Sequence, residues 1–113
     1  MPSERSLQAL LDIRDNIHFA RQFMDDLDEA AFITDRKTVY SVIRCLEIIS
    51  EASSRLAPDL KARHPEQPWD QIDGAGNIYR HNYENVAAGF VWRTVTGSLP
   101  SLLQVVETEL TGR

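Results

Sequence analysis

The sequence predicts an all-α protein, built as an up-and-down bundle of four to five helices. Apolar residues recur at three- and four-residue steps along most of the chain, which is the spacing of amphipathic helices. No segment alternates apolar and polar residues for long enough to form a sheet, and all five glycines lie beyond residue 73. A chain of 113 residues can bury one core but not two, so we expect a single domain over residues 1–113.

A first helix of about five or six turns is predicted from Leu7 onward. The apolar spacing breaks in the acidic stretch DDLDEAAF (25–32), which we interpret as the end of this helix. Thr34 or Asp35 then offers a side-chain oxygen that can cap the next helix. The apolar stripe of the first helix comprises Leu7, Leu10, Leu11, Ile13, Ile17, Ala20, Met24 and Leu27.

A second helix follows this cap. Pro58 either ends it or opens a short third helix over DLKAR (59–63), because proline is tolerated only in the first turn of a helix. The segment HPEQP (64–68) has two prolines in five residues and is predicted to be a loop that turns the chain back over the first two helices. The buried stripe of the second helix comprises Val39, Val42, Ile43, Leu46, Ile49, Ala52, Ser53 and Leu56.

Trp69 begins a further helix that is predicted to reach Tyr83. Gly74 and Gly76 lie inside it, and each costs about 1 kcal/mol of helix stability relative to alanine. Two reasons can explain such a cost: the close approach of a neighbouring helix, or room for a ligand or a partner chain. One face of this helix gathers Trp69, Ile72, Tyr79 and Tyr83, and another gathers Asp73, Asn77, Arg80, His81 and Glu84.

The last part of the chain is also predicted to be helical, with a boundary at Gly97. After this glycine, Ser98 can cap a final helix that has Pro100 near its first turn. Residues 86–96 carry Val86, Phe90, Val91 and Val95 with Trp92 beside them, and the final helix has an apolar face of Leu99, Leu102, Leu103, Val106 and Leu110.

The composition excludes several classes of protein. Seventeen acidic against twelve basic residues give a net charge of -5, which is the wrong sign for a broad nucleic-acid-binding surface, so any RNA site must be small and locally basic. Cys45 is the only cysteine, which excludes an internal disulfide and a zinc site built on paired thiols. There is no run of eighteen apolar residues and the chain starts with charges, so we expect a cytoplasmic protein without membrane contact.

The candidate chemistry lies in NIYRHNY (77–83). His81 has an imidazole that can move a proton at neutral pH, and Arg80 has a guanidinium that can hold a phosphate or its transition state. This combination suits phosphodiester cleavage by a neighbouring 2′-hydroxyl, which requires no metal ion or cofactor. The reaction needs a base and an acid, but one such helix supplies one histidine, so a dimer is needed to provide two. We expect His18 and His64 to be structural or solvated.

A plainer interpretation of the same residues stays open. Arg80 and His81 can form a solvated face that is salt-bridged to Asp73 and Glu84. The aromatic residues Trp69, Tyr79, Tyr83 and Trp92 need no function beyond packing, and Cys45 is interpreted as a small buried hydrophobe without reactivity.

Four segments follow one another along the chain: LDEAAF (27–32), RCLEIISEAS (44–53), PWDQIDGAGNIYRHNYENV (68–86) and VWRTVTGSLPSL (91–102). In this order they resemble the HepT-like proteins, helical bundles of the HEPN superfamily. The resemblance implies a homodimeric toxin that acts as a metal-independent ribonuclease on RNA. It also implies a partner, a minimal nucleotidyltransferase of the MntA type that serves as the antitoxin.

The family motif is an arginine, four to six residues, then His-x-Tyr. His81 and Tyr83 match the histidine and the tyrosine, whereas Gly76 stands where the commonest form of the motif has its arginine. Arg80 is therefore taken as the substitute cation, and Asn77 matches the asparagine beside the missing arginine. The resemblance thus implies that His81, Arg80 and Asn77 are the catalytic residues.

Tyr83 matches the tyrosine onto which the antitoxin transfers adenosine monophosphate (AMPylation). Its plainer role is to pack on Tyr79. Glu47 and Glu51 match polar positions of the family and, with Asp73, are candidates for supporting the motif helix or lining its cleft; otherwise they are solvent-facing charges. The alternative function is a non-catalytic bundle that docks a nucleotidyltransferase and helps to present a nucleotide or substrate.

Overall fold

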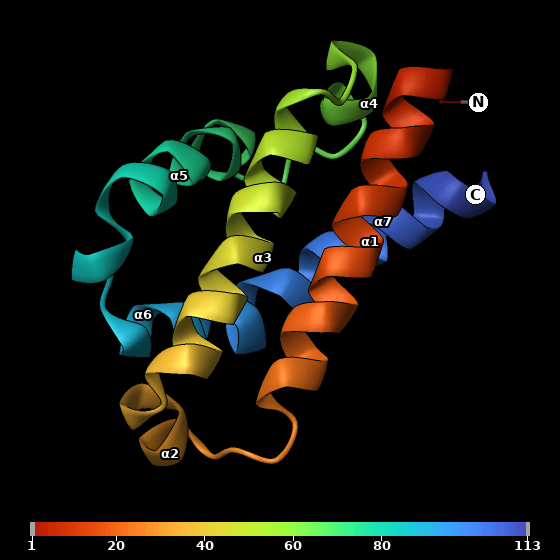
Figure 1. The fold of residues 1–113 in the computed structure, drawn as a ribbon. Coiled ribbons are helices and arrows are strands. Elements are labelled where there is room, and N and C mark those ends of the chain that lie inside the picture. Colours follow the sequence, from red (N-terminus) through yellow and green to blue (C-terminus); the bar gives the residue numbers. More distant parts are fainter. Residues whose placement is uncertain (1, 113) are drawn as a thin grey trace.

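The computed structural model describes residues 2–112, which form helices joined by short connections (Figure 1). Within these residues no helix is both long and apolar enough to cross a membrane. The elements are α1 (Glu4–Met24), α2 (Glu29–Thr34), α3 (Arg36–Ser54), α4 (Pro58–Ala62), α5 (Trp69–Asn82), the 3₁₀ turn η1 (Tyr83–Asn85), α6 (Ala88–Arg93), the π-helical turn η2 (Thr94–Ser98) and α7 (Leu99–Thr111).

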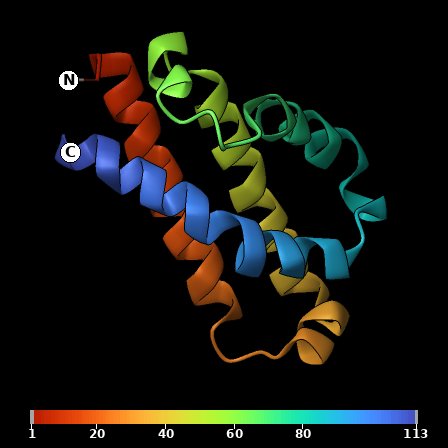
Figure 2. The ribbon, with the colours of Figure 1, turned by 180° about the vertical axis from the view of Figure 1, so that it is seen from behind.

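The long helices alternate in direction, which confirms the predicted up-and-down bundle. Helices α1 and α3 run antiparallel side by side, and α5 lies along the flank of α3 that faces away from α1 (Figure 1). Seen from behind, α6, η2 and α7 form one continuous rod across the back of α1 and α3 (Figure 2). The core between these layers includes Leu10, Ile13, Ile17, Phe32, Val42, Ile49, Leu60, Val91 and Val106.

The start of α3 agrees with the sequence, whereas the segment before it does not. The carboxylate of Asp35 accepts a hydrogen bond from the backbone amide of Thr38 at 3.1 Å, so Asp35 is the cap of the two candidates, Thr34 and Asp35. The predicted break at residues 25–32 is too long, because α2 begins at Glu29. Asp28 caps α2, and Phe32 is fully buried with its ring centroid 5.5 Å from that of Trp92 in α6. A six-residue helix is too short to show a helical period, so its burial is what stabilises it.

The predicted boundary at Gly97 and Ser98 coincides with the start of α7 at Leu99, but the predicted serine cap is wrong. Ser98 forms no side-chain cap, and the amide of Leu99 donates to the carbonyl of Thr94, five residues earlier, in a π-helical turn. Pro100 has no amide hydrogen, and in an unbroken α-helix its ring would collide with the carbonyl of Thr96. The wider turn accommodates the proline without ending the helix, so the rod continues from α6 into α7.

A buried carboxylate attaches the loop before α5 to α7. Glu109, whose side chain is 9% exposed, accepts hydrogen bonds from Arg63 at 2.8 and 3.2 Å and lies 2.6 Å from Nε2 of His64. In the same region, the side-chain amide of Gln67 donates to the hydroxyl oxygen of Ser101 at 2.7 Å. His64 is therefore structural, one of the two roles that the sequence allowed. The hydrogen bond from Arg63 lowers the pKa of Glu109 below its ordinary value, although burial acts in the opposite direction. His64 lowers this pKa further, by a smaller amount.

This contact makes stability depend on pH in a defined direction. Because the pKa of Glu109 is lower in the folded than in the unfolded chain, its stabilisation is complete above the ordinary value of 4.5 and is lost as the pH falls through the folded value. We expect Glu109→Gln to lower the free energy of unfolding at neutral pH, and this difference from wild type to shrink as the pH falls below the pKa of Glu109 in the folded chain. Urea titrations from about pH 7 to about pH 3 measure the free energy of unfolding of both proteins. A difference that stays constant over this range would contradict the lowered pKa of Glu109.

Candidate functional site

Helix α5 starts at Trp69, as predicted, because the Trp69 side chain is held by the end of α4. The indole nitrogen donates to the carbonyls of Lys61 and His64 at 3.1 and 2.9 Å. The ammonium of Lys61 lies 5.8 Å from the centroid of the same ring and 2.5 Å from a carboxylate oxygen of Asp73. These contacts define the direction in which α5 leaves the loop.

The first half of α5 crosses α3 at Ser50. The hydroxyl of Ser50 donates to the carbonyl of Ile72 at 2.6 Å and accepts from the amide of Gly76 at 2.7 Å. A Cβ atom at position 76 would lie 2.7 Å from the Ser50 oxygen and 2.9 Å from its Cβ. Close approach of a neighbouring helix therefore explains Gly76. It does not explain Gly74, around which an added Cβ would meet nothing within 4 Å.

The second half of α5 exposes the candidate catalytic residues. The guanidinium of Arg80 donates to the side-chain oxygen of Asn77 at 3.2 Å, so the structure brings these two together. His81 is exposed, next to Arg80 in the chain, and within residues 2–112 its ring forms no hydrogen bond. The site consists of a cation held by a neutral amide and an imidazole open to solvent. An imidazole and a guanidinium on one exposed surface can bind a phosphate and exchange a proton with it.

The salt-bridged interpretation of this face finds no support in the ion pairs. Asp73 is bonded to Lys61 and accepts from the hydroxyl of Ser53 at 2.7 Å, on the side of α5 that faces α3. Among the described residues Arg80 has no ion pair with Asp73 or with Glu84. Arg80 thus retains its charge for a ligand, while Asp73 anchors the helix that carries the site.

Tyr83 lies in η1, just beyond α5, and is 43% exposed. Its ring meets that of Tyr40 on α3 edge to face, with centroids 5.2 Å apart, so the packing partner is Tyr40 and not the expected Tyr79. Tyr79 is buried between α5 and α6, where burial raises the pKa of its hydroxyl although Thr94 acts in the opposite direction. Tyr83 therefore sits two residues from His81 with part of its side chain accessible.

The two glutamates of α3 have different surroundings. Glu47 pairs with Arg44, and its backbone carbonyl is 3.5 Å from the position of an added Cβ at residue 76, so Glu47 belongs to the helix crossing. Glu51 pairs with Arg55 at 3.1 Å. Because Arg55 also bonds Asp12 of α1 at 3.0 Å, Glu51 is drawn toward α1 and away from α5.

The remaining candidates carry no visible chemistry. Cys45 is buried, and burial raises the pKa of its thiol, which disfavours the reactive thiolate. His18 is exposed on α1. Across residues 2–112 no three histidine, cysteine or acidic side chains are grouped so that they could hold a metal ion.

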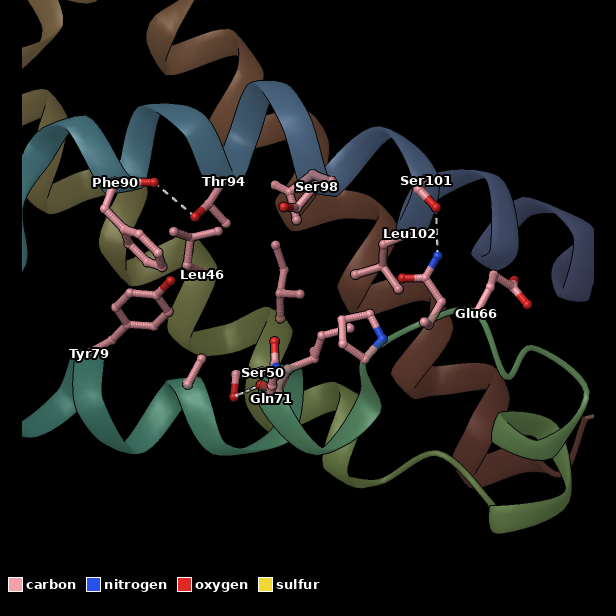
Figure 3. Close-up of a pocket in the computed structure, with 16 residues that line it drawn as sticks. Leu46, Ser50, Glu66, Gln71, Tyr79, Phe90, Thr94, Ser98, Ser101 and Leu102 are labelled. Atoms are coloured by element: carbon pink, nitrogen blue, oxygen red, sulfur yellow. Dashed lines mark hydrogen bonds between the residues drawn. The ribbon is translucent and has the colours of Figure 1, made fainter.

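Sequence reasoning missed a groove between α5 and the rod of α6, η2 and α7. An inner cavity of about 390 Å³ lies over Leu46 and Leu102, with the hydroxyls of Thr94, Ser98 and Ser101 along one side (Figure 3). It adjoins an outer hollow of about 690 Å³. The outer hollow is bordered by α5, η1 and α6, and its lining includes Ile78, Tyr79, Asn82, Asn85, Val86 and Phe90. No sequence spacing indicates such a groove, because it depends on how far α5 stands from the rod.

Comparison with known proteins points to one family. The profile described as Ribonuclease HepT-like matches residues 13–109. The chain is 38% identical over 93 residues to "Probable ribonuclease HepT" of Thermococcus cleftensis, across 82% of this chain and 84% of the relative. It is 34% identical over 106 residues to "Putative RNase MJ1380" of Methanocaldococcus jannaschii, across 93% and 97% of the two chains. No solved structure matches the chain.

The two glycines of α5 should respond in opposite ways to alanine. Gly76→Ala forces a Cβ against Ser50 and is expected to destabilise the protein by about 1–3 kcal/mol. In Gly74→Ala the added Cβ has no atom of another described part of the chain within 4 Å, so this change should gain up to about 1 kcal/mol of helix propensity. Urea denaturation measures both.

Ser50→Gly is the control, because it removes the atoms that a Cβ at position 76 would meet. Combined with Gly76→Ala, it should cost less than the sum of the two single changes. Equal effects of alanine at positions 74 and 76 would argue against the close crossing.

Proposed function

The chain belongs to the Ribonuclease HepT-like family, and on that premise we propose that it is a metal-independent endoribonuclease. The observation that carries this proposal is the pair of Arg80 and Asn77 beside the exposed His81. A guanidinium held by a neutral amide keeps its full charge for a phosphate, whereas one held by a carboxylate would be neutralised.

The proposed reaction is an attack of the RNA 2′-hydroxyl on the adjacent phosphorus. The bond between the 2′-oxygen and phosphorus forms while the bond to the 5′-oxygen of the next nucleotide breaks, which yields a 2′,3′-cyclic phosphate and a free 5′-hydroxyl. A base takes the proton from the attacking hydroxyl and an acid supplies one to the leaving oxygen. His81 performs one of these transfers, and Arg80 stabilises the negative charge that grows on the phosphate oxygens.

The second proton transfer requires a further group, and among residues 2–112 no second histidine lies at the site. We propose a homodimer in which the outer faces of two α5 helices line one cleft, so that each copy contributes a His81. The exposure of His81, Arg80 and Asn77 on one helix supports this arrangement, because no other part of the described residues covers them.

We further propose that a nucleotidyltransferase of the MntA type neutralises the protein as its antitoxin, by binding it and by AMPylation of Tyr83. The position of Tyr83 two residues beyond His81 and its 43% exposure support this site. An added adenosine monophosphate would place bulk and negative charge where the phosphate of RNA binds.

A second candidate function is a non-catalytic module that docks a nucleotidyltransferase. Two observations favour it: Gly76 occupies the position of the motif arginine, and the net charge is -5. Both features weaken the attraction for a phosphate, but neither affects a helical surface that could dock a partner. RNA cleavage therefore separates the ribonuclease from the docking module.

The purified protein is expected to cleave single-stranded RNA in the presence of EDTA. His81→Ala should lower the rate by about 100-fold or more, because general acid–base catalysis contributes that much. His18→Ala, at an exposed histidine on α1, is the matched control and should leave the rate unchanged. Gel assays on total RNA measure this. Cleavage by neither wild type nor variant would favour the docking module, and equal cleavage by wild type and His81→Ala would refute the assigned role.

Tyr83→Phe should abolish modification by the cognate nucleotidyltransferase and ATP, since the phenolic oxygen is the acceptor. Tyr40→Phe is the control, because Tyr40 packs on Tyr83 and is itself 39% exposed. Intact-protein mass spectrometry detects the added nucleotide. If Tyr83→Phe is still modified, the acceptor lies elsewhere.

A further inference from the structure

We propose that the outer hollow between α5, η1 and α6 is a subsite for one nucleobase of the RNA, next to the phosphate that is cleaved. The proposal rests on the ribonuclease function and deepens it, because it assigns a part of the substrate to a part of the chain that the catalytic residues leave unused. The hollow has a volume of about 690 Å³.

The hollow begins where the catalytic residues end. Ile78 and Asn82, which line it, lie three residues before His81 and one residue after it on α5. Side chains three residues apart on a helix are neighbours on its surface, so Ile78 adjoins His81. A phosphate bound at His81 and Arg80 would therefore lie at the rim of the hollow, and the base of an adjoining nucleotide is the part of the RNA that would enter.

The lining suits a base and does not suit a phosphate. No charged residue of the described chain lines the hollow, so nothing there would balance a phosphate. Phe90, 51% exposed, and Tyr79 lie close together on opposite walls of the groove, from α6 and α5 (Figure 3). Every base has a π face that can stack on such a ring, and single-stranded RNA is commonly bound in this way.

Two amides provide the polar contacts that a base edge needs. Asn82 and Asn85 both line the hollow, and neither side chain is hydrogen-bonded within residues 2–112. An amide offers a donor and an acceptor together, which matches the edge of a base. An apolar protein surface laid over the hollow would bury both amides without partners, and each would cost free energy. The amides therefore favour a base over a second copy of the chain.

The test measures binding without cleavage. Labelled 2′-O-methyl RNA oligonucleotides cannot undergo 2′-hydroxyl attack, and a set in which each member lacks one base identifies the stacked position. In fluorescence anisotropy titrations with EDTA, Phe90→Ala should weaken binding of the intact oligonucleotide by about tenfold. The same substitution should have no effect on the oligonucleotide that lacks the stacked base, because the two changes remove the same contact.

Matched variants separate stacking on the ring from a general loss of apolar contact. Phe90→Leu keeps an apolar side chain without a ring and should weaken binding as Phe90→Ala does. Phe19→Ala removes an aromatic residue of similar exposure, 47%, from α1 and should leave binding unchanged. Asn82→Ala, a second change in the hollow, should alter which base is preferred at the stacked position. Circular dichroism verifies that each variant is folded.

Several results would overturn the subsite. The first is RNA binding by Phe90→Leu that equals that of wild type, the second is an equal loss of affinity of Phe90→Ala for every oligonucleotide, and the third is no RNA binding by wild type. The fourth is a changed oligomeric state of RNA-free Phe90→Ala in sedimentation, which would assign the hollow to contact between copies. If wild type cleaves RNA but Phe90→Ala binds RNA as tightly as wild type does, the subsite alone is refuted. Base-dependent binding through Phe90 without cleavage of natural RNA would refute the ribonuclease proposal alone.

Discussion

The hydroxyl of Ser50 is the contact on which the arrangement of the site depends. It bonds two backbone groups of one turn of α5, the carbonyl of Ile72 and the amide of Gly76, and it can do so only because residue 76 has no side chain. This close crossing sets the rotation of α5 on α3. The rotation turns Arg80 and His81 to solvent, brings Tyr83 onto Tyr40, and leaves the groove between α5 and the rod behind it.

The same crossing accounts for the way this chain departs from the motif that it resembles. Position 76, where the resemblance leads us to expect the motif arginine, is buried against Ser50, so a longer side chain would collide with α3 before it reached the outer face. Arg80, one turn later, is exposed and its guanidinium is held by Asn77. The cation and the tight helix crossing therefore occupy different turns of α5, and the chain can have both.

Local signals predicted most of the fold, and tertiary contacts decided the rest. The stripe of α3, the stripe of α1 apart from the exposed Leu7, and the start of α5 at Trp69 follow from side-chain spacing, and the Asp35 cap follows from cap chemistry. The short helix α2 depends on burial of Phe32, and the π-helical turn near Pro100 continues a helix that the local residues suggested would end. In the site, the Arg80 and Asn77 pair follows from helical spacing. The Tyr40 partner and the groove involve other elements and have no sequence signal.

The negative net charge constrains how such a protein can hold RNA. Part of the acidic charge is paired within the chain, since Asp12, Asp73 and Glu109 pair with Arg55, Lys61 and Arg63. Arg80 is bonded to an amide instead, so under the proposed function it would attract a phosphate at short range although the net charge of the chain opposes this. Affinity that basic proteins draw from long-range attraction must then come from contacts at the site itself. The stacking and amide contacts that we propose for the uncharged hollow beside His81 would be contacts of that kind, because they do not depend on net charge.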